Sequence, residues 1–496
     1  MRREKKYTAL FLALALCLLL AGCGDAVIGP APSGSAPSAS AQGQAAIPSG
    51  GVTAIILSGE TASVRGGGAA VDGTTIKINS PGEFTVEGAL DEGRIVVNTG
   101  EVKGDVTLRL RGAELRCASG PAILVEQVKN FYLVLEDGSF NRLVSGTEES
   151  AVSGKQEGAA LFSEDDMDIL GDGALEILGF LNNGITCKDD LDIKGGSLMI
   201  RARNNGVKGA ESVEITGGEI RIEAGNDGVK STSAKKEGKG FVTVSGGLLE
   251  ITAGGDGMTA ESALEISGGD VRITTTGASE TSSKGLKAKT MLLISGGTLG
   301  LNTADHALHS TADLRVTGGE IKLQSAGKGL AAHGVLDIAE GRLDIVSEND
   351  GLDAELGVNI AGGQIGIFSR QDGIHVGGES SGAGSFTLSG GAVSISAFEQ
   401  VFDVRGSAAV TGGRLAGVGT ATSPKGFSAP STQLSLLFSF AGGENSTAQI
   451  SSDASGEVIG TIESRCGYNY AIYTTPELTH GAYHLTRGTL SAAARA

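Results

Sequence analysis

The sequence predicts an all-β protein whose body is a single-stranded parallel β-helix with coils of about 22 residues. The first observation is a Gly-Gly step that recurs from Gly195-Gly196 to Gly412-Gly413, with a period of 22 residues at most steps and of 28 or 29 at the others. Second, an Asn, Asp or Lys followed by Gly lies ten residues after most of these steps, as at Asn205-Gly206. Third, polar and apolar residues alternate between the two markers, as expected for short β-strands.

The apolar residue after the second marker should point inward on every coil and form a stacked core. These residues are Ile185, Val207, Val229, Met258, Leu286, Leu308, Leu330, Leu352, Ile374 and Phe402. The three longer intervals contain segments rich in Ser, Gly, Lys and Glu, which should be loops at one corner of the coil. They span residues 231–239, 275–282 and 377–385.

The N-terminus has the features of a bacterial lipoprotein signal. Basic residues at positions 2, 3, 5 and 6 precede an apolar run at 9–20, and Leu20-Ala21-Gly22-Cys23 follows as a lipobox. A short transmembrane helix is the alternative, but the apolar run is too short to span a bilayer. We therefore expect an exported protein that is cleaved before Cys23 and lipid-anchored through it, at the extracellular face or in the cell envelope.

The rest of the chain divides into a tether, a coil stack and a cap. Residues 23–52, which follow the signal at 1–22, are mostly Gly, Ala, Ser, Pro and Gln and should be a flexible tether. Residues 53–415 should form the β-helix, with irregular opening coils at 53–177 and regular repeats at 178–415. Residues 416–490 hold most of the tyrosines and should form a C-terminal β cap on the open solenoid edge.

The charge balance bears on the partners. The chain has 39 basic and 57 acidic residues and a formal charge of -18, which disfavours nucleic acid and anionic lipid as direct partners and favours cations. Beyond Cys23, the remaining cysteines Cys117, Cys187 and Cys466 are few and far apart, so no disulfide framework is expected. The body should therefore be stabilised by its own packing, as a monomer.

Repeated carboxylates identify candidate cation sites. Residues one coil apart stack at about 4.8 Å, so like charges repel unless a cation lies between them. Three groups of Asp and Asn satisfy this register, and their oxygen ligands suit calcium. The first pairs Asp165 and Asp166 with Asp189 and Asp190, the second pairs Asp227 with Asp256 beside Asn226, and the third pairs Asp350 with Asp372 beside Asn349 and Asp353. The alternative is that they are ordinary corner residues whose side chains bond to backbone.

Between the acidic groups, the same position is occupied by Lys284, His306 and Lys328. A basic stripe between cation sites would suit an anionic polysaccharide, although simple charge balance with neighbouring acids is an open alternative. Residues 182–415 contain no Trp or Tyr, so a row of aromatic platforms for a neutral glycan is not expected there. The C-terminal tyrosines are the remaining candidates for binding cellulose.

Several segments resemble the calcium-binding parallel β-helix proteins of bacterial surfaces, a family of carbohydrate-binding domains associated with cellulose and polygalacturonate. The matching segments are the Gly-Gly and Asp-Gly repeats together with Val71–Ile76, Leu135–Asn141, Leu161–Ile169 and Thr475–Tyr483. The resemblance extends over residues 53–488. It implies a parallel β-helix that binds calcium and a polysaccharide.

Three functions are compatible with these features. The leading one is a non-catalytic, calcium-dependent surface protein that binds acidic polysaccharide such as polygalacturonate. The second is a polyuronate lyase, in which Lys208, Lys230 or Lys284 would be the base. The third is a structural surface adhesin. Nucleophilic hydrolysis is not supported, because no Ser, His and Asp residues form a group in matched register.

Overall fold

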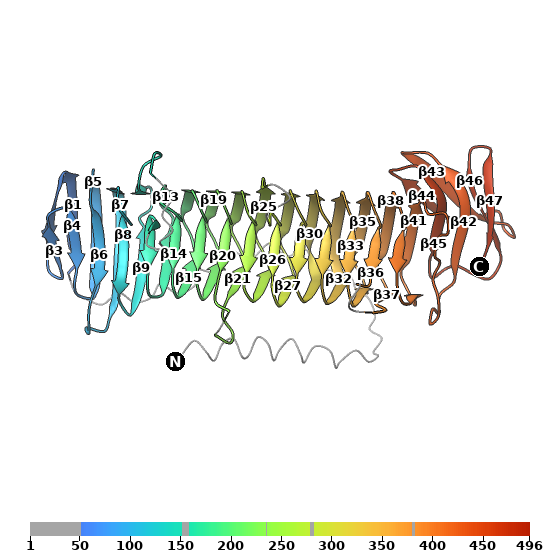
Figure 1. Cartoon of the computed structure of the whole chain (residues 1–496), viewed down its shortest axis with the longest axis horizontal. Helices are drawn as coiled ribbons and strands as arrows, with labels where there is room; N and C mark the ends of the chain where they lie inside the picture. Colours follow the sequence, from blue (N-terminus) through green and yellow to red (C-terminus); the bar gives the residue numbers. More distant parts are fainter. Residues whose placement is uncertain (1–50, 151–157, 235, 278–281, 379–381) are drawn as a thin grey trace, which may run out of the picture. The chain divides into compact units, whose positions relative to one another are not determined.

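The computed structural model describes residues 51–150, 158–234, 236–277, 282–378 and 382–496. Residues 51–496 form one unit (Figure 1). The predicted signal, Cys23 and almost all of the predicted tether lie outside the described residues, as do parts of the loops predicted at 275–282 and 377–385. The described part of the chain contains no helix long and apolar enough to cross a membrane.

The described residues form an all-β solenoid of stacked parallel coils, as predicted (Figure 1). A typical coil contains three strands, for example β17 (Val207–Gly209), β18 (Ser212–Ile215) and β19 (Glu219–Ala224). The first joins a 15-stranded sheet and the other two join a 28-stranded sheet. Leu308 pairs with Leu330, and Leu330 with Leu352, which confirms the 22-residue period in the regular coils. Earlier, Leu161 pairs with Ile185, so the period there is 24 residues.

The core lies between the two sheets. All ten residues of the predicted inner column are at most 2% exposed, and they pair in register from coil to coil. The Gly-Gly step is required where successive coils turn in close contact. Gly218, for example, has a φ of +93°, and a Cβ at this position would lie 2.8 Å from the carbonyl oxygen of Gly196 on the preceding coil. Only glycine combines this conformation with such a close backbone approach.

The 15-stranded sheet forms one face of the coil stack. Its remaining strands, in chain order, are β3 (Ala69–Asp72), β4 (Thr75–Ile78), β6 (Arg94–Asn98), β8 (Ile123–Gln127), β11 (Leu161–Ser163), β14 (Ile185–Cys187), β20 (Val229–Ser231), β23 (Met258–Ala260), β26 (Leu286–Ala288), β29 (Leu308–Ser310), β31 (Leu330–Ala332), β33 (Leu352–Ala354), β36 (Ile374–Val376) and β39 (Phe402–Val404).

The 28-stranded sheet supplies the rest of each coil. Its other strands are β1 (Thr53–Gly59), β2 (Thr61–Arg65), β5 (Gly82–Leu90), β7 (Asp105–Cys117), β9 (Asn130–Leu135), β10 (Phe140–Ser145), β12 (Met167–Gly171), β13 (Ala174–Gly179), β15 (Asp190–Ile193), β16 (Ser197–Ala202), β21 (Phe241–Val244), β22 (Leu248–Ala253), β24 (Ala263–Ile266), β25 (Asp270–Thr275), β27 (Met291–Ile294), β28 (Thr298–Thr303), β30 (Asp313–Ser325), β32 (Val335–Ser347), β34 (Gly357–Ile360), β35 (Gln364–Ser369), β37 (Ser385–Leu388), β38 (Ala392–Ala397), β40 (Ala408–Val410), β41 (Arg414–Gly419), β42 (Ser435–Gly442) and β45 (Tyr468–Thr474).

Antiparallel pairings occur at both ends of the stack. At the beginning, β1 pairs with β2 and β3 pairs with β4. At the end, β45 pairs antiparallel with both β41 and β42. A separate antiparallel sheet follows, made of β44 (Val458–Ser464), β43 (Ser446–Ser452), β46 (Ala482–Arg487) and β47 (Leu490–Arg495). Strand structure thus continues beyond residue 490, where the predicted cap ended.

Candidate functional site

Most predicted site residues lie along the edge and outer face of the 15-stranded sheet, whereas Asp190 of the first acidic group begins β15 in the 28-stranded sheet. We call the residues at the second sequence marker the corner column. From β14 onward they are Asn183, Asn205, Asp227, Asp256, Lys284, His306, Lys328, Asp350, Asp372 and Gln400. The middle residue of each short strand, three positions later, points outward and forms the central column. Its members are Thr186, Lys208, Lys230, Thr259, Lys287, His309, Ala331, Asp353, His375 and Asp403.

Corner side chains are used to join one coil to the next. An oxygen of Asp227 accepts the backbone N–H of Asp256 at 2.9 Å, and an oxygen of Asp350 accepts that of Asp372 at 3.2 Å. Even His306 follows this pattern, since its Nδ1 accepts the N–H of Lys328 at 3.1 Å. The Asn, Asp and His side chains of the corner column therefore bond to the backbone of the following coil rather than to their own. One oxygen of each such carboxylate has a structural role.

The second oxygen distinguishes the acidic pairs. Asp227 contacts the ammonium of Lys230 at 2.6 Å, and Asp256 contacts that of Lys287 at 3.1 Å. Both carboxylates are buried and have a cation beside them. Asn226, which was predicted to assist them, donates instead to Asn205 Oδ1 at 3.1 Å. A lysine thus already neutralises each member of this pair.

The third acidic group contains a compact cluster. One ligand atom from each of Asp350, Asp353 and His375 lies within 4.8 Å of the others, a separation that a single metal ion can bridge. Lys328 approaches Asp353 at 2.7 Å and Asp350 at 3.5 Å, and His375 Nδ1 lies 2.6 Å from Asp353. Asn349, which was predicted beside this group, is not one of the clustered residues; its backbone N–H donates to the carbonyl of Gly327 at 3.1 Å.

The pKa values of the carboxylates in this region are shifted in different directions. Burial raises the pKa of Asp350, and burial raises the pKa of Asp372 to about 6. Burial acts in the same direction on Asp353, but the hydrogen bond from His375 and the charge of Lys328 hold its pKa below the ordinary value. Asp372 uses one oxygen to accept the backbone N–H of Gln400 at 2.8 Å. Asp350 and Asp372 are therefore carboxylates that a further cation would stabilise in the charged form.

The first acidic group is dispersed by other contacts. Asp165 accepts the N–H of Val128 at 2.8 Å, and Asp190 binds the ammonium of Lys239 at 2.7 Å. Asp166 accepts the N–H of Asp190 at 3.3 Å. Burial and the neighbouring Glu211 raise the pKa of Asp189 to about 6.

Two lysines of the insertion at 231–239 reach this first group. Lys236 binds Glu211, and Lys239 binds both Asp190 and Glu211. The lysine content of the insertion was visible in the sequence, but the direction in which the loop folds was not.

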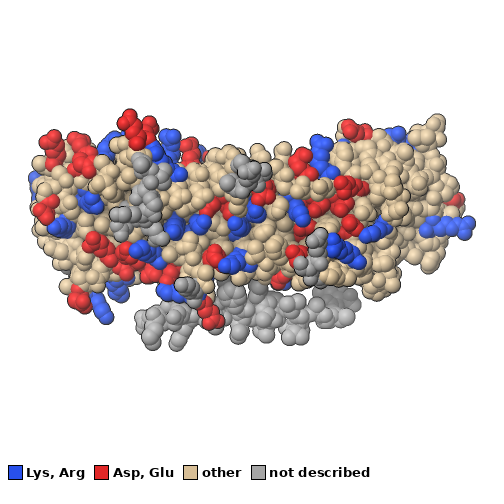
Figure 2. All heavy atoms as spheres, viewed as in Figure 1, with Lys and Arg blue, Asp and Glu red and all other residues tan. Residues whose placement is uncertain are grey.

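The two lysines of the predicted basic stripe are ion-paired. The ammonium of Lys284 lies 2.5 Å from Asp305, and Lys328 is shared by Asp350 and Asp353. His306 Nδ1 also lies 3.0 Å from Asp305, and burial lowers its pKa. Figure 2 shows positive and negative side chains interspersed along the face that it displays. These contacts favour charge balance for Lys284 and Lys328.

Lys208 is the exception in the central column. It has no carboxylate within ion-pair distance among the described residues, and burial together with the adjacent Lys230 lowers its pKa. The reason is visible in the sequence: the corner residue three positions earlier is Asn205, where Lys230 has Asp227. Aligning the two Gly-Val-Lys repeats would therefore have predicted that Lys208 lacks the acidic partner of Lys230, which the spacing of the repeats alone did not indicate.

The central column is recessed at several positions, one of which is His309. Thr186 is 1%, Ala331 is 4% and His309 is 8% exposed, although all three point away from the core. His309 Nδ1 is buried without a hydrogen-bond partner in the described structure. Its ring lies 5.7 Å from that of His306 and 5.4 Å from that of His333. Burial lowers the pKa of His309 to about 4, so it is neutral at neutral pH.

The C-terminal tyrosines do not form an exposed platform. Tyr468, Tyr470, Tyr473 and Tyr483 are each at most 7% exposed. The hydroxyl of Tyr470 accepts the backbone N–H of Val401 at 2.6 Å. These rings are core residues, so flat stacking of a cellulose chain on them is not supported.

Comparison with known proteins identifies the family. The model for the family described as carbohydrate-binding domain-containing protein matches residues 72–329 and 326–461. The chain belongs to this family. The two matches include every residue of the corner and central columns. The carbohydrate-binding domain family thus covers the coils on which the predicted site lies.

Individual relatives cover less of the chain. A carbohydrate-binding domain-containing protein of Acetivibrio thermocellus is 29% identical over 137 residues, which are 27% of this chain and 48% of the relative. The match thus spans about half the length of this curated relative. A solved structure of the polysaccharide lyase-like protein from C. thermocellum, a gadolinium derivative, is 28% identical and covers 50% of this chain and 96% of its own, with a TM-score of 0.44.

Proposed function

We propose that this chain is a non-catalytic cell-surface protein that binds acidic polysaccharide, such as polygalacturonate, along the central column, with calcium bound at the acidic end of that column. Membership of the carbohydrate-binding domain family supports the class of partner. The acidic character of the ligand is inferred from the charges on this face. A structural adhesin remains the alternative without a specific supporting contact.

The observation that favours an anionic ligand is the ammonium of Lys208, which has no carboxylate within ion-pair distance in the described part of the chain. A half-buried lysine without a counterion is destabilised, and a carboxylate from a ligand would supply the missing charge. Lys230 lies one coil further, about 4.8 Å along the column, and is paired with Asp227, so a second ammonium lies in line with that of Lys208. A uronate polymer repeats its carboxylates along one axis, which matches cations presented by stacked coils.

Calcium would be held by Asp350, Asp353 and Asp372. Carboxylate oxygen is the preferred ligand of calcium, and burial, which raises the pKa values of Asp350 and Asp372, disfavours their charged forms unless a cation is present. A bound cation would also bridge the acidic end of the column to the carboxylates of the polymer. The pair Asp227 and Asp256 fits less well, because lysines already contact both.

The test is binding of polygalacturonate and of a neutral β-glucan, each with calcium and with excess chelator. We expect polygalacturonate to bind better and chelator to weaken it. Lys208→Gln should weaken polygalacturonate binding several-fold. The matched control is Lys322→Gln on the opposite sheet, where the lysine is 66% exposed and paired with Glu320. Equal binding of both polymers, insensitive to chelator and to Lys208→Gln, would contradict the proposal.

We also propose that the protein is exported and lipid-anchored through Cys23. The lipobox at 20–23 supports this location. Cys23→Ala should move the protein from the membrane fraction into the soluble fraction or leave its signal uncleaved. Unchanged membrane attachment of this variant, with no lipid detected on the wild-type N-terminus, would contradict it.

A polyuronate lyase is the second candidate, favoured by one observation. A lyase base must be neutral when it acts, and Lys208 is a lysine whose pKa is lowered by burial and by Lys230. The other two candidate bases are less suitable, since Lys230 and Lys284 are ion-paired with Asp227 and Asp305.

A further inference from the structure

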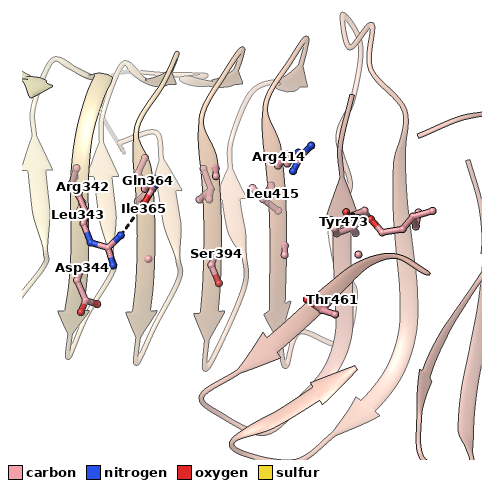
Figure 3. A pocket seen from close by; sticks show the side chains of 16 residues that line it. Arg342, Leu343, Asp344, Gln364, Ile365, Ser394, Arg414, Leu415, Thr461 and Tyr473 are labelled. Atoms are coloured by element: carbon pink, nitrogen blue, oxygen red, sulfur yellow. Dashed lines mark hydrogen bonds between the residues drawn. The ribbon is translucent and has the colours of Figure 1, made fainter. Parts of the chain in front are cut away.

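A hollow lies on the outer face of the 28-stranded sheet, away from the corner and central columns. It is formed where strand β44 and strand β45 approach the outer face of β32, β35, β38 and β41, and it has a volume of about 620 Å³ (Figure 3). This volume falls within the range of about 300 to 1,000 Å³ that is typical of small-ligand sites. We call it the junction groove. No residue of the corner or central column lines it.

The floor of the junction groove is made of small side chains in one register. Asp344, Gly366, Ser394 and Ala416 lie opposite one another on successive coils. The fold does not require glycine at position 366, because a Cβ there would have no atom nearer than 3.8 Å and the backbone is not left-handed. The missing side chain keeps the centre of the groove open. The floor extends over three coil spacings, or about 14 Å.

The polar groups around the floor are suited to an acidic, hydroxyl-rich ligand. Arg342 donates to Gln364 Oε1 at 2.8 Å and has no carboxylate partner among the described residues (Figure 3). Arg342 is exposed, so the rest of its guanidinium can bind a carboxylate in the two-bond arrangement that arginine favours. Arg414, at the other end, is paired with Glu477 at 2.6 Å. Asp344, Ser394 and Thr461 are exposed and can bond to hydroxyl groups.

We propose that the junction groove is a second saccharide site, which takes a short acidic oligosaccharide segment and pairs one uronate carboxylate with Arg342. This inference rests on the proposed function for the class of ligand, but it uses separate residues. An extended apolar ligand is disfavoured, because the open floor is bordered by two arginines, an aspartate and a glutamine. Two separated sites would allow one polymer chain to engage the protein twice and raise its avidity.

The experiment exploits two glycines that occupy the same column. Gly300 and Gly366 both face outward from the 28-stranded sheet, in the register Gly300, Lys322, Asp344, Gly366. A Cβ at either position would have no heavy atom nearer than 3.8 Å, so Phe should be tolerated equally by the fold. Gly366→Phe fills the groove, whereas Gly300→Phe lies three coils away. The probe is a short oligogalacturonate, with titration calorimetry as the measurement.

We expect Gly366→Phe to weaken binding of this probe at least tenfold and to lower the stoichiometry, with Gly300→Phe equal to wild type. Arg342→Gln should weaken the acidic probe and leave a neutral oligosaccharide of the same length unaffected. If Gly366→Phe binds the probe like wild type while Lys208→Gln binds it more weakly, the groove is not a saccharide site and the proposed function is unaffected. A loss in Gly366→Phe with no effect of Lys208→Gln would support the groove and contradict the central-column site. If the neutral oligosaccharide binds as well as the acidic probe, and Arg342→Gln changes neither, the proposal that the groove selects an acidic ligand is wrong.

Discussion

Two acidic pairs occupy the same position in the fold yet have different surroundings. Asp227 and Asp256 form the first pair, and Asp350 and Asp372 form the second. In both pairs, one carboxylate oxygen accepts a backbone N–H from the next coil. The first pair is neutralised by Lys230 and Lys287. In the second pair burial raises both pKa values, and Lys328 must serve Asp350 and Asp353 together.

The difference shows that register alone does not make a cation site. Stacking places two carboxylates on neighbouring coils in each case, but the central-column residue beside each carboxylate decides the local charge. Where that residue is lysine, as at Lys230, the corner carboxylate has a partner. Where it is Asp353 or His375, the region stays acidic and suits an added cation.

The largest effect should come from calcium. At a calcium concentration a hundredfold above the dissociation constant, binding to the native state alone adds about 2.7 kcal/mol of stability. Asp372→Asn should abolish the calcium-induced rise in melting temperature, while Asp256→Asn should retain it. Asn preserves the acceptor for the N–H of Gln400. The measurement is thermal unfolding with calcium and with excess chelator.

The calcium effect should also depend on pH with a defined sign. The folded-state pKa of Asp372, about 6, lies above its unfolded value. Without a cation, the ionised group therefore destabilises the native state increasingly as the pH rises from about 4 to about 6, and the loss is complete above pH 6. Calcium should stabilise the protein most above pH 6 and lose its effect as protons compete below it. A melting temperature unchanged by chelator at pH 8 would refute calcium binding at the second pair.

The next largest effect should come from removing the lysine that neutralises Asp227 in the first pair. Lys230→Met removes the cation from Asp227, whose side chain is 6% exposed. Removing one partner of a fully buried pair costs about 3–5 kcal/mol, and because Lys230 is partly exposed we expect about 2 kcal/mol. Lys322→Met is the control, for which we expect about 0.5 kcal/mol or less. Local hydrogen exchange in β20 and β23 measures this loss; an equal loss in both variants would show that the lysine does not neutralise the pair.

A smaller effect should come from His309, which lies between the two pairs. Its pKa is about 4 because of burial and the nearby charges of Lys284, His306, His333 and Lys287. This depressed pKa means that the native state loses stability as the pH falls from about 6.5 towards 4. His309→Leu removes the titration, so the variant should exceed wild type in stability by about 1 kcal/mol at pH 5. Urea unfolding at pH 5 and 7.5 checks this; a pH-independent difference would contradict the titration.

The sequence predicted the fold well because one structural rule repeats. Glycine at the corners and alternation along the strands are local signals, and the inner column from Ile185 to Phe402 follows from counting. The antiparallel pairing of β45 with β41 was not predictable in this way. That contact joins residues far apart in a region without a period, so no spacing encodes it.

The candidate site was predicted only in part. Counting identified which carboxylates stack, and the structure places Asp350 and Asp353 together with His375, which the prediction had omitted. Counting did not reveal that lysines of the 231–239 loop fold back onto Asp190 and Glu211. The junction groove was also not evident, because β44 and β45 reach the coil face from a segment that has no repeat.

The smallest expected effect is in lyase activity, for which we predict no sustained turnover. The central column contains one lysine without a carboxylate partner among the described residues, Lys208, and its pKa is lowered by burial and by Lys230. The measurement is absorbance of the unsaturated uronate product at neutral and alkaline pH with added calcium. Wild type and Lys208→Ala should both remain at the background rate.

A neutral lysine alone is not sufficient for elimination, because the base must reach the proton while a cation stabilises the charge that develops on the carboxylate. The proposed calcium ligands Asp350 and Asp353 lie six coils along the column from Lys208, or about 29 Å. One uronate cannot contact both. Sustained product that requires calcium and disappears in Lys208→Ala would therefore show that a cation binds beside Lys208, and it would replace the binding function with an enzymatic one.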